Sequence, residues 1–204
     1  MKKVIVLFML FFFIFSTSFV FPLYASAYNG SSAANYAQEW AYSYNPQYPV
    51  PPNREDCTNF VSQCIRAGGI SYMWNGNPTT YLPWWYILYE HGSRSFTDAV
   101  LLIKHFNFVR NVPYGEAQWK EGTLYSCPYS REGDIMQIAV SSIYPPSMDD
   151  IYHSRIVVYL SGGIPYCAQH TTNYYGVRWD LRTNGESLGT LGKYVTVFYW
   201  TPHN

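Results

Sequence analysis

Charged residues are scarce in this chain. Asp, Glu, Lys and Arg make up 13% of its 204 residues, with 13 basic and 13 acidic side chains. No run or stripe of lysine and arginine occurs that would give the electrostatic footprint of a protein that binds nucleic acid or an anionic membrane. We therefore predict neither partner.

The sequence also lacks the spacing of a metal site, since no two Cys, His or acidic residues recur as zinc ligands do. Cysteine itself is sparse, and the four that are present form no dense disulfide framework. Cys57 and Cys64 fall in one expected helix, about 10 Å apart along its axis, which is too far for a disulfide. Cys127 and Cys167 are left as either a disulfide or two thiols. We expect no metal and no other cofactor.

The N-terminus reads as a secretory signal peptide. Lys2 and Lys3 precede an apolar run over residues 4–15, and a stretch of small residues ends in Ala25-Ser26-Ala27. The run is about a dozen residues long, short of the roughly 20 that a membrane-spanning helix needs, although an uncleaved anchor is the alternative. We expect cleavage after Ala27 and a secreted, extracellular protein.

The mature chain, residues 28–204, is expected to form one domain. Loss of residues 1–27 leaves 177 residues, enough for one hydrophobic core. It also removes two lysines, which leaves 11 basic and 13 acidic residues of the original 13 and 13. We expect a nearly neutral monomer.

Helical periodicity comes first along this domain and strand patterns follow. Apolar spacing predicts helices over 32–44, 57–67 and 95–106, the third with Ser95 and Asp98 as a capping box. Strands are predicted over 134–140, 153–160, 164–172 and 194–200, and residues 70–92 form a long aromatic loop without a clean period. This order predicts an α+β fold, with the N-terminal helices packed on an antiparallel sheet.

Cys57 stands at the start of the second helix, after Asp56 as N-cap. Free backbone N–H groups and the positive end of the helix dipole would stabilise a thiolate there and lower its pKa. The same N–H groups would hold the oxyanion of a tetrahedral intermediate. A buried cysteine that acts as a small hydrophobic residue is the alternative. Position at a helix start favours a nucleophile.

The segment around this cysteine, residues 56–64 with the sequence DCTNFVSQC followed by Ala67-Gly68-Gly69, closely resembles the nucleophile motif of the putative amidase domain family of exported bacterial proteins. The resemblance extends over nearly all of the mature chain and includes Tyr36-Ala37, Trp40, Asn45, Gly133-Asp134, His153-Ser154 and Gln169-His170-Thr171. It implies a papain-like fold, shared with the NlpC/P60 and CHAP groups, in which a Cys, a His and a polar residue follow one another along the chain. Asp134 itself is expected to bond a turn rather than to act in catalysis.

His153 opens a predicted strand, and histidine is well suited to take a thiol proton and return it to a leaving amine. His170 is the other histidine that falls on a neighbouring strand. If the two strands pair outward from a tight turn at residues 161–164, His170 lies diagonal to His153 on one face. A register change of one residue would place Gln169 or Thr171 there instead.

Together these residues predict an exported cysteine hydrolase that cleaves amide or peptide bonds. Cys57 attacks, His153 moves the proton and His170 orients the imidazole. The expected partner is an amide- or peptide-containing substrate outside the cell, and the resemblance points first to cell-wall peptidoglycan. The alternatives are a catalytically silent module that binds wall glycan or peptide, and an acyl transferase with the same triad.

Overall fold

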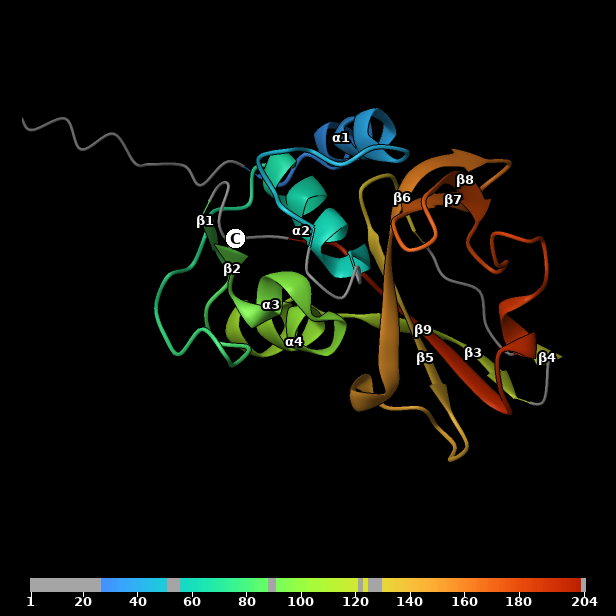
Figure 1. The fold of residues 1–204 in the computed structure, drawn as a ribbon. Coiled ribbons are helices and arrows are strands. Elements are labelled where there is room, and N and C mark those ends of the chain that lie inside the picture. The colour runs from blue at the N-terminus through green and yellow to red at the C-terminus, as the bar shows by residue number, and fades with distance from the viewer. Residues whose placement is uncertain (1–26, 51–55, 88–90, 121–122, 125–129, 203–204) are drawn as a thin grey trace, which may run out of the picture.

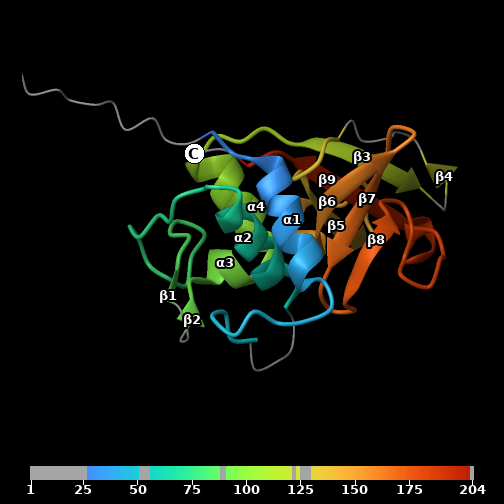
Figure 2. The same cartoon turned by 90° about the horizontal axis from the view of Figure 1, so that it is seen from above.

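The computed structural model describes residues 27–50, 56–87, 91–120, 123–124 and 130–202. The helices lie together on one side of a curled antiparallel sheet of seven strands (Figures 1 and 2). The predicted mixture of helices packed on an antiparallel sheet is therefore confirmed. The expected signal peptide, residues 1–27, falls almost entirely outside the described residues.

The seven strands of the sheet run in the order β4-β3-β9-β5-β6-β7-β8. Every neighbouring pair is antiparallel. The bounds are β3 Gly115–Lys120, β4 Thr123–Leu124, β5 Ile135–Ser141, β6 Ile151–Ser161, β7 Ile164–Gln169, β8 Tyr174–Arg178 and β9 Tyr194–Trp200. The sequence predicted β5, β6, β7 and β9, and it missed β3, β4 and β8.

Four α-helices are present in the described residues: α1 Gly30–Trp40, α2 Cys57–Ala67, α3 Arg94–Thr97 and α4 Ala99–Lys104. A π-helical turn, His105–Val109, continues α4, and 3-10 turns lie at Met148–Asp150 and Leu188–Thr190. A small second sheet pairs β1 Tyr86–Ile87 with β2 His91–Gly92. No helix in these residues is long and apolar enough to cross a membrane.

The third predicted helix is interrupted at Asp98, which corrects the expectation of one helix with a capping box at Ser95. Asp98 has extended backbone angles, φ −110° and ψ 127°, and its side chain accepts a hydrogen bond from the Leu101 N–H. A short acidic side chain of this kind satisfies a free amide at a helix start better than it serves a helix interior. The segment therefore divides into α3 and α4.

The main hydrophobic core lies between the helices and the sheet. Helix α1 contributes alanines, which allow α2 to approach closely, and α2 is the most deeply placed helix, with nine of its eleven residues buried. A second cluster, which includes Met136, Val157 and Cys167, covers the opposite face of the sheet. Because α2 is buried on most sides, its polar residues must find partners inside the protein.

The hairpin of β6 and β7 begins in the predicted register, with Leu160 opposite Pro165. The register then shifts by one between Val157 and Tyr159, so a β-bulge leaves one extra residue in β6. A bulge of this kind exchanges the faces on which later residues of the two strands meet. The shift decides which β7 side chains lie beside the strand end that carries His153.

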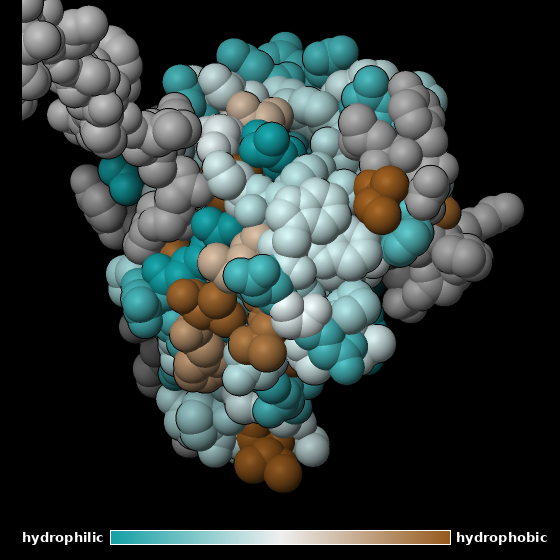
Figure 3. Space-filling model, turned by 90° about the vertical axis from the view of Figure 1, so that its left-hand side faces the viewer, coloured by the Kyte–Doolittle hydropathy of each residue, from teal (hydrophilic) through white to brown (hydrophobic). Residues whose placement is uncertain are grey.

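The aromatic segment predicted as a loop packs both against itself and against the main core, where Trp84 and Tyr86 contact Phe96. Trp74 and Trp85 stack with ring centroids 5.3 Å apart, and Met73 pairs with Trp84 in an isolated bridge. Figure 3, viewed from the side of β1 and β2, shows hydrophobic residues in separate patches among hydrophilic ones. Within this segment Trp84, Trp85 and Tyr86 are buried, whereas Trp74 is 56% exposed.

Candidate functional site

Cys57 is the first residue of α2, and Asp56 occupies the N-cap position as predicted. The Asp56 carboxylate, however, makes no capping hydrogen bond. Its Oδ2 lies 2.5 Å from Nδ1 of His170, and its Oδ1 accepts a hydrogen bond from Asn59 Nδ2 at 2.6 Å. The amides of the first turn are therefore not occupied by the cap side chain, and they stay available beside the Cys57 sulfur.

Burial raises the pKa of the Cys57 thiol, although the backbone of Ser154 and the side chain and backbone of Thr58 act in the opposite direction. Cys57 is only 7% exposed. The sequence predicted a lowered pKa from the helix terminus, and the structure corrects that direction because desolvation of the thiolate is the larger effect. Cys57 therefore rests as a neutral thiol near neutral pH.

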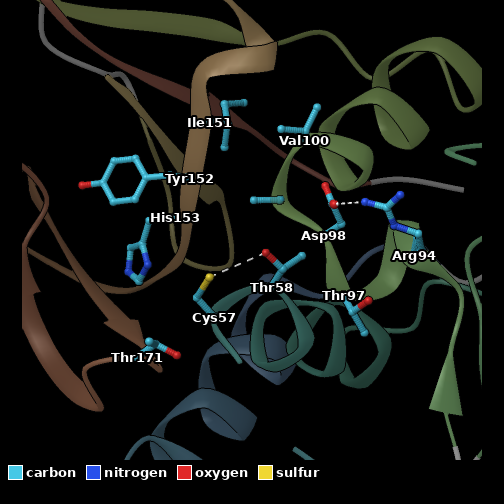
Figure 4. Close-up of a pocket in the computed structure, with 11 residues that line it drawn as sticks. Cys57, Thr58, Arg94, Thr97, Asp98, Val100, Ile151, Tyr152, His153 and Thr171 are labelled. Atoms are coloured by element: carbon cyan, nitrogen blue, oxygen red, sulfur yellow. Dashed lines mark hydrogen bonds and ion pairs between the residues drawn. The ribbon is translucent and has the colours of Figure 1, made fainter. Parts of the chain in front are cut away.

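His153 lies on β6 and lines the same pocket as Cys57. In Figure 4 the sulfur of Cys57 and the ring of His153 point toward one another. Burial lowers the pKa of His153 to about 3, the charge of Arg155 lowers it further, and the side chain of Gln169 opposes both. The imidazole is therefore neutral and can accept a proton.

The distal nitrogen of this imidazole is poorly satisfied. Nε2 of His153 is buried and has no hydrogen-bond partner among the described residues, and the same holds for Oε1 of Gln169. The amide nitrogen of Gln169 donates to the carbonyl of Thr172 at 2.9 Å, which directs the oxygen of that amide elsewhere. The side chain of Gln169 nevertheless affects the pKa of His153, so the two residues are neighbours. Nε2 of His153, as a donor, and Oε1 of Gln169, as an acceptor, are therefore suited to each other.

His170, predicted to orient His153, lies instead on the helix side of the sheet. Its Nδ1 faces Asp56, and its Nε2 donates to the backbone carbonyl of Trp40 at 2.9 Å. Its ring stacks on Phe60, with centroids 4.0 Å apart. The bulge in β6 is the physical reason, because it turns the side chain of His170 away from the face of His153. Both ring nitrogens of His170 have acceptors, so neither is left for the base.

A chain of buried polar groups ties the start of α2 to the sheet, and the sequence did not reveal it. The hydroxyls of Thr58 and Ser154 lie 3.0 Å apart, and Nε2 of Gln137 donates to Ser154 at 3.0 Å and to the Ala99 carbonyl at 2.7 Å. Oε1 of Gln137 accepts from Trp200 at 3.2 Å. The only signal was a glutamine inside an otherwise apolar strand. The network fixes the strand end and helix start that meet at the site.

The other residues singled out by the resemblance hold the fold around the site. The hydroxyl of Tyr36 donates to Gln63 at 2.7 Å and accepts from Asn45 at 2.8 Å, which joins α1 to α2. Asp134 accepts hydrogen bonds from the Arg131 N–H and from Thr201, as its predicted structural role requires.

Two further cysteines among the described residues lie apart from the pocket lining. Cys64 and Cys167 are buried free thiols in the two core clusters. Cys127 lies outside the described residues.

The pocket that contains Cys57 has a volume of about 730 Å³. Its lining comes from α2, α3, α4, β6 and the end of β7: Cys57, Thr58, Arg94, Thr97, Asp98, Ala99, Val100, Ile151, Tyr152, His153 and Thr171. The Cys57 thiol and the neutral His153 imidazole thus lie in the lining of one pocket. Among the described residues, no three His, Cys, Asp or Glu side chains are grouped as metal ligands.

Comparison with known proteins agrees with this arrangement at the level of the family. The uncharacterized protein YjcM of Bacillus subtilis (strain 168) is 42% identical over 53 residues, which are 26% of this chain and 13% of that protein. No solved structure matches the chain. The model of the putative amidase domain matches residues 27–191, most of the chain, and this family indicates a hydrolase. The chain belongs to the putative amidase domain family.

Proposed function

We propose that the protein is a cysteine hydrolase of amide or peptide bonds, in which Cys57 is the nucleophile and His153 the general base. The observation that carries this proposal is the placement of both side chains in one pocket, at a helix start and on the adjoining strand. Membership in the putative amidase domain family supports the same class of reaction. We further propose that the fold is papain-like, because a cysteine at a helix start faces a histidine on an antiparallel sheet.

The reaction starts from a neutral pair, as the raised pKa of Cys57 and the lowered pKa of His153 indicate. As sulfur forms a bond to the carbonyl carbon, the thiol proton moves to Nδ1 of His153. The imidazolium then gives this proton to the amine as the carbon–nitrogen bond breaks, which leaves a thioester. Water adds to the thioester with loss of its proton to the imidazole, and the acid and the thiol are released.

Gln169 is proposed to orient the base in place of His170. Its free Oε1 is the acceptor that Nε2–H of His153 lacks, and a hydrogen bond between them would leave Nδ1 as the basic nitrogen toward Cys57. A neutral amide adds no negative charge beside the imidazole, so it orients the ring without holding a proton on it. A Cys, a His and a polar residue would then follow one another along the chain.

Backbone amides at the first turn of α2 are proposed to hold the oxyanion. Asp56 is turned toward His170 and Asn59, so its carboxylate makes no capping bond to them. A negative charge that develops on the substrate oxygen would meet these N–H groups and the positive end of the helix dipole. The charge is largest in the tetrahedral intermediate, and the stabilisation is largest there as well.

The proposed setting is outside the cell, in the form of a monomer released by cleavage after Ala27. The charged, apolar and small-residue regions of a signal peptide in residues 1–27 support export. Peptide bonds of peptidoglycan are the proposed substrate class, because they are the abundant amides outside a bacterial membrane. Purified wall fragments are therefore the first material to test.

The experiment incubates the protein with purified wall peptides and identifies the products by mass. New products are expected with the wild type and a loss of at least about 1000-fold with Cys57→Ala, since the covalent step is removed. Cys64→Ala, which alters a buried thiol away from the pocket lining, should retain activity per folded molecule. Equal products from wild type and Cys57→Ala would overturn the mechanism. Products that incorporate an added amine would identify acyl transfer instead of hydrolysis.

A further inference from the structure

The end of the pocket that carries α3 and α4 holds an ion pair. Among the described lining residues, Arg94 is the single cation and Asp98 the single carboxylate. Figure 4 shows the pair on the α3 and α4 side of the pocket, with Cys57 and His153 on the other. Nη2 of Arg94 donates to Oδ2 of Asp98 at 2.7 Å.

The two members of this pair are held differently. Asp98 accepts at both oxygens, from Arg94 and from the Leu101 N–H at 3.0 Å, so its charge is directed into the protein. Arg94 has its main-chain N–H bonded to the carbonyl of Pro78, and its side chain is 59% exposed against 29% for Asp98. A guanidinium has five N–H donors, so the bond to Asp98 leaves others for a ligand of the pocket that Arg94 lines.

Between this pair and the thiol the pocket offers a short apolar stretch. Val100 and Ile151 line one side, and the uncharged Thr58 and Thr97 line the other (Figure 4). An aliphatic segment fits beside the two apolar side chains without leaving a charge or a hydrogen-bonding group unpaired. The lining thus changes from Cys57 and His153, through an apolar stretch, to the ion pair of Arg94 and Asp98.

We propose that Arg94 binds a carboxylate of the substrate, separated from the scissile bond by a short aliphatic spacer. This inference rests on the proposed function, since it names the substrate class of the same pocket. A planar guanidinium matches a carboxylate through paired N–H donors. Arg94 is thus the specificity residue of the pocket, and a ligand carboxylate shares its guanidinium with Asp98.

The test reads the alkylation of Cys57 directly, so it does not depend on a known substrate. The probes are iodoacetyl derivatives of glycine, β-alanine and longer ω-amino acids, each compared with its neutral carboxamide. In each case sulfur bonds to the methylene carbon, iodide leaves and the thiol proton passes to solvent. The rate of loss of unmodified Cys57 is followed by peptide mass, and each carboxylate-to-carboxamide ratio is divided by the same ratio for free cysteine.

At the spacer length that reaches Arg94, the corrected ratio is expected to be about tenfold in favour of the carboxylate, the size of one charge-assisted contact. Arg94→Gln should bring the ratio to about one, and added salt should reduce it in the wild type. Asp98→Asn should raise it, because a competing negative charge is removed while asparagine still caps α4. Lys104→Gln, which removes a cation outside this pocket, should leave it unchanged.

A corrected ratio of one or less at every length in the wild type would overturn the inference, as would a preference that Arg94→Gln retains. The two proposals fail separately. Cleavage of wall peptides without a carboxylate preference rejects the role of Arg94 alone. A preference that Arg94→Gln abolishes, without cleavage of any amide, supports the role of Arg94 in this pocket and rejects the proposed function.

Discussion

His153 and His170 lie on neighbouring strands, yet their surroundings are opposite in kind. His170 has acceptors at both ring nitrogens and a stacked aromatic ring beneath it. Within the part of the chain that the structure describes, His153 has a buried Nε2 without a partner, and its pKa is lowered to about 3, chiefly by burial. Almost all buried polar groups in proteins have hydrogen-bond partners. A buried polar atom without one at a pocket therefore lowers stability and is typical of a functional position. The comparison supports the proposal that His170 has a structural role and that His153 acts in the reaction.

The substitution His153→Ala is the strongest test of the difference between the two histidines. We expect kcat/KM to fall by about 1000-fold, within the range that a general base contributes, while the melting temperature changes little. The measurement is the cleavage of a wall peptide that the wild type accepts, with thermal melts beside it. His91→Ala, which alters a histidine outside the pocket lining, is the matched control. Retention of activity in His153→Ala would remove this residue from the reaction.

His170→Ala should show the reverse pattern. It leaves Oδ2 of the buried Asp56 without its His170 partner and removes the ring that stacks on Phe60. A buried polar group that loses its hydrogen-bond partner costs about 1–3 kcal/mol of unfolding free energy. Denaturant unfolding measures this, and kcat/KM corrected for the folded fraction should fall less than about tenfold. A loss of activity as large as that of His153→Ala, at unchanged stability, would restore His170 as the orienting residue.

The smallest expected effect concerns Gln169. Gln169→Ala should lower kcat/KM by about tenfold, since the imidazole stays in place and loses only its orienting acceptor. Gln169→Glu should move the acid limb of the pH profile to higher pH, because a nearby carboxylate raises the pKa of His153 from its value of about 3 and protonates the base sooner.

Gln47→Glu adds the same charge in an exposed loop and serves as the control for this series. An acid limb at the same pH in wild type and Gln169→Glu would show that Gln169 does not act on the base.

The contrast between the two histidines also shows what the sequence predicted and what it did not. The start of α2, the strand of His153 and the pairing of Leu160 with Pro165 followed from periodicity, motif and turn length. The bulge in β6 adds one residue and has no clear sequence signal, so the predicted strand register beyond it was wrong by one residue. For this reason His170 was predicted on the face of His153, whereas it lies on the other face.

Burial explains the other differences between prediction and structure. The helix terminus favours a thiolate, but desolvation depends on how many atoms surround Cys57, and only the packed structure gives that balance. The division of α3 from α4 similarly depends on whether Asp98 bonds an amide locally, a choice that an apolar periodicity does not encode.

The side chain of Gln137 connects two of the helices that line the pocket. Its amide nitrogen donates hydrogen bonds to the Ala99 carbonyl of α4 and to the Ser154 hydroxyl, which contacts Thr58 of α2. Its amide oxygen accepts a hydrogen bond from Trp200. Ala99 and Thr58 both line the pocket. Helices α2 and α4, which both line the pocket, are thus joined through the side chain of Gln137, to α4 directly and to α2 through Ser154. Any movement that separates α2 from α4 at this point must break at least one of these buried hydrogen bonds, so the network resists a change in the spacing of the two helices.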